Sequence, residues 1–133
     1  MGVSIYVSLE QEIAGVDPLA INGKPLSRAV DALDEWAQTM RLTPLMEMVS
    51  SPPDEIAELM DVDVEDLPEP LAAEQWFATA DGLKTIRAMI DYLQQQTTAV
   101  KAAGDVLTDL QDIEAVLMAA EQAQVRFHFS IDF

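Results

Sequence analysis

The segment Val125–Phe133 alternates apolar and polar residues along its whole length. Its odd-numbered residues are all apolar and its even-numbered residues are all polar. Because successive side chains of a strand point to opposite faces, this pattern predicts a strand with one face toward a core and the other toward water. Val3–Leu9 alternates in the same way and predicts a second half-buried strand. The rest of the chain must then cover the apolar face of both strands.

Two strands alone are marginally stable in water, so we expect the predicted strands to pair with each other or with a third strand. One candidate for that third strand is Gln75–Phe77. The other is Leu19–Ile21, which precedes the turn-forming pair Asn22-Gly23.

Between the two predicted strands, apolar residues recur at three- and four-residue steps, which predicts four or five amphipathic helices. Helix starts are expected at Ser27, Thr43, Ser51, Thr79 and Gly104. The order of strand, helices and strand predicts an α+β fold in a single domain over residues 1–133. In this fold a small sheet, which includes the N- and C-terminal strands, packs against the helices.

The charge balance of the chain limits its partners. The 133 residues carry 24 acids against 7 bases, which gives a net charge of −17. This charge repels nucleic acid and anionic membrane surfaces, and it favours a basic protein partner or cations. There is no Cys, which excludes thiolate chemistry, and no apolar run is long enough to span a membrane. We therefore expect a cytoplasmic protein that binds neither nucleic acid nor membrane.

The acids concentrate between Leu42 and Leu83, where the sequence contains eleven acids and no Lys or Arg. The stretch Asp61–Pro70 lies in this region and is predicted to be an acidic surface loop, since Pro68 and Pro70 prevent a regular helix there. A calcium-binding EF-hand loop would need Gly at its sixth position and Glu at its twelfth. Counted from Asp61, those positions hold other residues, so no metal site is assigned. The residues predicted to contact a protein partner are Asp61, Asp63, Glu65, Asp66 and Glu69.

Three further acids, Asp105, Asp109 and Asp112, lie along one face of the predicted helix that begins at Gly104. Carboxylates on one helix face can serve as acid and base or bind a metal ion. Such sites usually include a histidine, and the one His of this chain lies elsewhere in the sequence. We interpret the three acids as a solvent-exposed helix face.

The polar face of the terminal strands is the candidate ligand site. If the strands are neighbours, Tyr6, Arg126 and His128 converge there, with Asp132 on the same face. They would supply a hydroxyl donor, a cation and a group that titrates near neutrality. The alternative is a polar face that is exposed to solvent or that contacts a second copy of the chain. No P-loop, G-x-G-x-x-G, H-E-x-x-H or G-x-S-x-G motif is present, so no catalytic residue and no cofactor are assigned.

The run Trp76–Arg87 (WFATADGLKTIR), together with the ending Val125–Phe133 (VRFHFSIDF), resembles a group of small uncharacterised bacterial proteins. The resemblance implies a bacterial cytoplasmic protein. It implies no activity and transfers no functional residue.

These observations favour a non-catalytic, acidic protein-interaction module that binds a basic partner or forms a homodimer. One concrete version is an inhibitor or immunity-type protein that covers a basic enzyme such as a nuclease. The alternative is a small-ligand or metal-assisted enzyme that uses the polar face of the terminal strands. The two classes differ in their expected response to added Ca²⁺, Mg²⁺, Mn²⁺ and Zn²⁺, because a metal that binds only the native state raises its melting temperature.

Overall fold

The computed structural model describes residues 3–68, 71 and 73–132. Two strands lie at the ends of this region, β1 (Ser4–Leu9) and β2 (Phe127–Asp132). Between them lie four α-helices: α1 (Lys24–Thr39), α2 (Pro53–Met60), α3 (Thr79–Gln95) and α4 (Ala103–Ala123). Three short 3-10 helices complete the order: η1 (Pro18–Ala20), η2 (Leu45–Met48) and η3 (Val64–Asp66).

The two terminal strands pair with each other, as the alternating patterns predict. β1 runs antiparallel to β2 in an unbroken register from Ser4 opposite Asp132 to Leu9 opposite Phe127. Four helices and this two-stranded antiparallel sheet make an α+β fold, which confirms the predicted class. The predicted end of the second strand at Phe133 lies outside the described residues.

Neither candidate for a third strand forms one among the described residues. Phe77 makes a single bridge to Phe127, and Val49 makes a single bridge to Phe129. The hydrogen bonds at these bridges, made by Phe77 and by Ser50, lie on the edge of β2 that faces away from β1. The other candidate segment forms η1 instead, because the carboxylate of Asp17 accepts a hydrogen bond from the amide of Leu19 and stabilises a tight turn.

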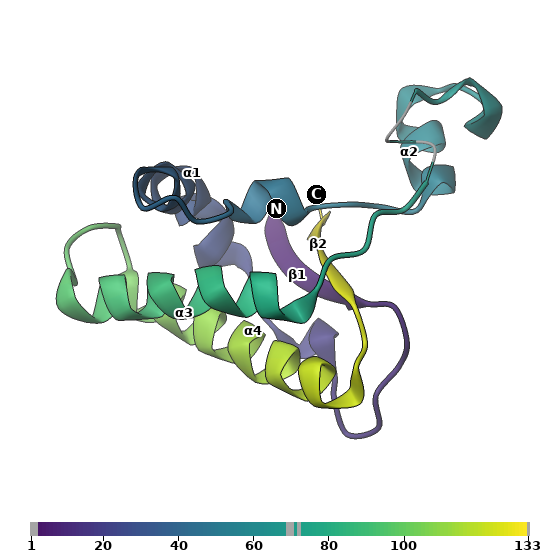
Figure 1. Cartoon of the computed structure of the whole chain (residues 1–133). Coiled ribbons are helices and arrows are strands. Elements are labelled where there is room, and N and C mark those ends of the chain that lie inside the picture. Colours follow the sequence, from purple (N-terminus) through teal and green to yellow (C-terminus); the bar gives the residue numbers. More distant parts are fainter. Residues whose placement is uncertain (1–2, 69–70, 72, 133) are drawn as a thin grey trace.

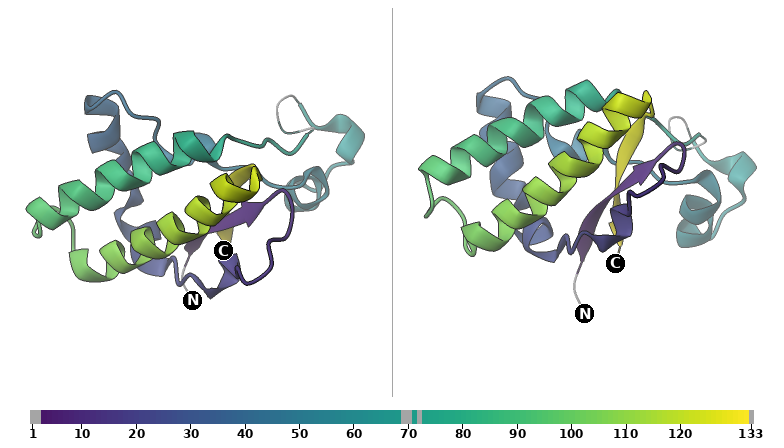
Figure 2. Two further views of the ribbon diagram at one scale, coloured as in Figure 1. Left: turned by 60° about the horizontal axis from the view of Figure 1, so that its bottom comes forward. Right: turned by 90° about the horizontal axis from the view of Figure 1, so that it is seen from below.

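The apolar face of the strands packs against the helices. Ile5, Val7, Phe127 and Phe129 are all at most 2% exposed and belong to one core with α1, α3 and α4. Figure 1 shows α3 and α4 side by side along one face of the strands, and the view from below in Figure 2 shows the same layering. The phenyl ring of Phe127 lies so close to Gly82 of α3 that no side chain would fit there without displacing the ring.

Helix α1 begins three residues before the predicted start at Ser27. Gly23 adopts a left-handed conformation (φ 74°) at the helix N-cap, close to the backbone of Ile5. A Cβ atom at this position would collide with the carbonyl oxygen of Ile5, so Gly is required there. The amide of Ile5 also donates a hydrogen bond to the carbonyl of Gly23 at 3.1 Å, which joins β1 to the start of α1.

Candidate functional site

An acidic arm projects from the body of the protein. We use this name for residues 53–67, which comprise α2, η3, the residues between them and Leu67. α2 packs against η3 more closely than against any other element, and both lie apart from the strands and from α3 and α4 (Figures 1 and 2). Inside the arm, Ala57 and Leu67 are buried, and the amide of Val62 donates a hydrogen bond to the carbonyl of Ala57 at 3.0 Å. The segment predicted to be a loop after Asp61 therefore has local structure.

The surface of the arm combines negative charge with exposed apolar side chains. It carries seven acids and no base, and all seven are exposed: Asp54, Glu55, Glu58, Asp61, Asp63, Glu65 and Asp66. Leu59 is 78% exposed, and Met60, Val62 and Val64 are each more than 40% exposed. Large apolar side chains at such exposure mark surfaces that contact other molecules when they gather in one place.

The structure places four of the five predicted partner-contact residues on this arm. Asp61 ends α2 in a left-handed conformation (φ 56°), and Asp63 precedes η3. Glu65 and Asp66 form part of η3 itself. Glu69 lies outside the described residues. Sequence analysis did not predict the exposure of Leu59 and Met60, because the apolar spacing in α2 indicated a side packed on a core, and the core of the protein lies away from the arm.

The two chain segments that lead into and out of the arm are fixed to β2. The amide of Ser50 donates to the carbonyl of Phe129 at 3.0 Å, and the amide of Phe77 donates to the carbonyl of Phe127 at 2.7 Å. The two segments are also joined to each other, since the amide of Gln75 donates to the hydroxyl of Ser50 at 2.8 Å. The base of the arm is thus held by hydrogen bonds to the sheet.

His128 lies at this base and is buried, whereas the alternating pattern had predicted a solvent-facing position. Its side chain is 1% exposed. The indole of Trp76 covers the imidazole with a distance of 4.6 Å between ring centroids. Nε2 of His128 lies 2.5 Å from a carboxylate oxygen of Glu74. The predicted solvent exposure of His128 was wrong, because alternation indicates which face of the strand a residue occupies and does not indicate whether another segment covers that face.

The imidazole of His128 has polar partners at both ring nitrogens. Nδ1 lies 3.0 Å from the carbonyl oxygen of Phe129. The hydroxyl of Ser130 lies 3.2 Å from the same nitrogen and 2.7 Å from the hydroxyl of Ser8. Together with the contact between Nε2 and Glu74, these contacts link Glu74 to β2.

The predicted ligand-binding residues do not come together as one group. The register places Tyr6 opposite Ser130, and it places Ser8 opposite His128. Arg126 is exposed and forms an ion pair with Glu10 at the end of the strands, with 3.2 Å between Nε and Oε1. The hydrogen bond that Arg126 donates to Glu10, followed by the negative charge of Glu10, raises the pKa of Arg126 further above its usual range. Any ligand role of Tyr6, Arg126 and His128 remains a prediction.

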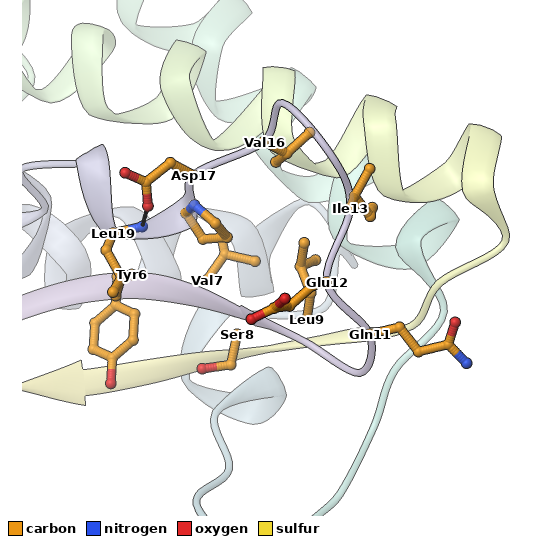
Figure 3. A pocket seen from close by; sticks show the side chains of 11 residues that line it. Tyr6, Val7, Ser8, Leu9, Gln11, Glu12, Ile13, Val16, Asp17 and Leu19 are labelled. Atoms are coloured by element: carbon orange, nitrogen blue, oxygen red, sulfur yellow. Dashed lines mark hydrogen bonds between the residues drawn. The ribbon is translucent and has the colours of Figure 1, made fainter.

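A cavity of about 500 Å³ lies beside β1, between the strand and the loop 10–17 that follows it (Figure 3). Tyr6 and Ser8 contribute to its lining, but His128 does not. Glu12 and Asp17 are its charged residues, so the cavity carries only negative charge.

Two buried aspartates join distant segments, and sequence analysis did not foresee either. Asp34 of α1 accepts hydrogen bonds from the amides of Leu45 and Met46 at 2.8 and 3.1 Å, and it thereby caps η2. Asp109 was predicted to be exposed on α4, but it is 2% exposed and accepts from the amide of Leu26 in α1. Burial raises the pKa of both carboxyls, although these hydrogen bonds lower it. Both aspartates have structural roles.

Among the described side chains, no three His, Asp or Glu residues lie close enough to share one metal ion. No helix in the described part of the chain has the length and apolar character needed to cross a membrane. Comparison with models of protein families, with curated proteins and with solved structures finds no match to this chain.

Proposed function

We propose that the protein is a non-catalytic interaction module whose acidic arm binds a basic protein partner. The observation that carries this proposal is the position of exposed apolar side chains among carboxylates on a projecting arm. Leu59 is 78% exposed, and the seven acids around it are not accompanied by any Lys or Arg. Solubility alone explains a charged surface, but it does not explain exposed Leu, Met and Val side chains on the same surface.

The two kinds of side chain have different roles in the proposed contact. Burial of Leu59, Met60, Val62 and Val64 would supply affinity, at about 25 cal/mol for each Å² of apolar surface removed from water. The carboxylates would raise the association rate and reject acidic proteins. The anchoring of the arm to β2 through Ser50 and Phe77 supports this function, because a pre-organised surface loses less conformational entropy on binding.

The charge of the arm favours a basic partner over a second copy of the chain. Two arms in contact would bring fourteen carboxylates together with no base on either side, which is strongly repulsive. A basic protein neutralises the same charge. An inhibitor or immunity-type protein that covers a basic bacterial enzyme, such as a nuclease, is the concrete version of this proposal, and a cytoplasmic location fits it.

The test is to capture binding proteins at low salt and then to measure affinity for each purified basic protein that is captured. One variant neutralises four arm acids with Asp61→Asn, Asp63→Asn, Glu65→Gln and Asp66→Asn. A matched control neutralises four exposed acids of the body with Asp31→Asn, Glu35→Gln, Asp112→Asn and Glu121→Gln. The two variants have the same net charge, so they separate the arm from total charge.

The proposal expects the arm variant to lose about tenfold or more in affinity, with the loss mainly in the association rate, while the control binds as the unmodified protein does. Leu59→Ser is expected to weaken binding mainly through faster dissociation. The proposal fails if no basic protein is captured at low salt. It also fails if the control variant loses as much affinity as the arm variant.

A further inference from the structure

A second cavity, of about 370 Å³, lies where α1 meets the turn between α3 and α4. Residues at positions 25, 28, 29 and 32 line it from α1, a spacing that places them on one helix face. Residues 99–102 and Asp105 line it from the turn and the first turn of α4. The space exists because the facing positions hold small side chains, mainly alanines.

The charges at this cavity differ from those over the rest of the molecule. Two of the seven bases of the chain, Arg28 and Lys101, line it together with one acid, Asp105. Neither base forms an ion pair with a described residue, even though Asp105 lines the same space. The lining therefore has a net positive charge in a protein of net charge −17. The cavity beside β1, by contrast, is lined by acids and no base.

We propose that this cavity binds a small organic monocarboxylate with a short apolar body. Arg28 and Lys101 are both exposed and both line the cavity, and the guanidinium of Arg28 can hold a carboxylate through two parallel hydrogen bonds, with Lys101 as a second cation. Pro25, Ala29 and Val100 supply an apolar wall for the body of the ligand. A volume of this size lies within the range of small-molecule sites, which are mostly apolar with a few polar groups that orient the ligand.

The same lining selects against other anions. A phosphate has no apolar part to bury against alanine and proline side chains. Its second negative charge would also lie near the carboxylate of Asp105, which repels a dianion more strongly than a monoanion. A neutral molecule of the same shape would leave both cations without a partner. This inference does not depend on the proposed role of the acidic arm.

The experiment is a titration of the full chain with hexanoate at constant ionic strength, followed by ¹H–¹⁵N NMR. Hexanamide and inorganic phosphate serve as the neutral and the dianionic comparison. The proposal expects hexanoate to shift amide signals of residues 25–32 and 99–105 in a saturable manner. Arg28→Gln and Lys101→Gln should each weaken hexanoate binding by about tenfold. Lys84→Gln should leave it unchanged, since Lys84 is exposed on α3 and does not line the cavity.

Several results would overturn the assignment. Hexanamide that binds as tightly as hexanoate would show that the cations do not select the ligand. If phosphate shifts the same signals at a concentration equal to or lower than that of hexanoate, the cavity is a site for simple anions and not a monocarboxylate site. If hexanoate causes no signal shifts, or causes shifts that are scattered over the surface, the cavity does not bind it. Ala32→Trp narrows the cavity without changing its charge, so unchanged hexanoate affinity in this variant would also contradict the proposal.

Discussion

The carboxylate of Asp109 in α4 accepts a hydrogen bond of 3.0 Å from the backbone amide of Leu26 in the first turn of α1, 83 positions earlier in the chain. The first amides of a helix have no partner within the helix. Gly23, at the N-cap of α1, has no side chain to supply one, so a residue of another helix does so. This bond ties the start of α1 to α4.

Replacement of Asp109 by Ala should lower the free energy of unfolding by about 1–3 kcal/mol, because the buried amide of Leu26 would lose its acceptor. Asp109→Asn keeps an acceptor oxygen and should cost less. Asp112→Ala, on an exposed position of the same helix, should change stability by no more than about 0.5 kcal/mol. Urea denaturation of the three variants measures these values. Equal losses at positions 109 and 112 would contradict the capping role.

Stability should depend on pH through the two buried aspartates. Burial raises the pKa of Asp34 and Asp109 in the folded state above the usual value of about 3.9. At pH values between the unfolded and the folded pKa, the unfolded chain has lost protons that the folded chain retains. The contribution of the two aspartates to stability is therefore complete below about pH 4 and falls as pH rises through the folded pKa.

The double variant Asp34→Asn, Asp109→Asn removes this dependence. The difference in unfolding free energy between the unmodified protein and the variant should decrease with rising pH and then become constant. Denaturant titrations at closely spaced pH values measure it. A difference that increases with pH over the same range would show that the folded-state pKa values are lowered instead.

Two glycines in helices should respond oppositely to the same substitution. Gly82→Ala places a methyl group against the ring of Phe127 and the side chain of Leu117, which should cost about 1–3 kcal/mol and outweigh the gain in helix propensity. Nothing lies within 4 Å of the equivalent position at Gly104, so Gly104→Ala should stabilise the protein by about 0.5 kcal/mol. Thermal unfolding followed by calorimetry gives the sign of the change in stability for each substitution. Stabilisation by both substitutions would mean that Phe127 is not packed on α3.

Loss of the Glu74 carboxylate should loosen the base of the acidic arm. Glu74→Ala leaves Nε2 of the buried His128 without a partner, and the expected loss is about 1–3 kcal/mol. In a Trp36→Phe background, Trp76 is the remaining tryptophan. Because the ring of Trp76 packs against that of His128, acrylamide should quench its fluorescence more strongly when Glu74→Ala is added to this background. Glu10→Ala breaks the exposed pair with Arg126 and should change stability little, because water screens exposed ion pairs, and it should not change the quenching.

The fold class could be predicted because its determinants are local in the sequence. The alternation in residues 3–9 and 125–133 marks strands, and the three- and four-residue steps between them mark helices, before any contact is known. The pairing of the terminal strands followed from the need of each for a partner. The start of α1 was misplaced because its cap comes from Asp109, which no local pattern connects to Leu26.

The candidate site was predicted only in part. The run of acids marked the arm, but the exposure of Leu59 depends on where the arm lies relative to the body, which periodicity does not specify. His128 was assigned to the correct face of its strand and to the wrong environment. Glu74 and Trp76, the residues that cover it, are more than fifty positions away, and nothing in their immediate sequence indicated that they would.

The pairing of β1 with β2 sets an order of events during protein synthesis. The hydrogen bond between the hydroxyls of Ser8 and Ser130 spans 122 positions. At translation rates of about 5–20 residues per second, the first strand waits on the order of ten seconds for the second. Phe127 and Phe129, which the helices pack against, arrive at the same late time. A nascent chain that stops before residue 127 therefore exposes both a strand edge and the inner faces of three helices, and it should require chaperones until β2 has been made.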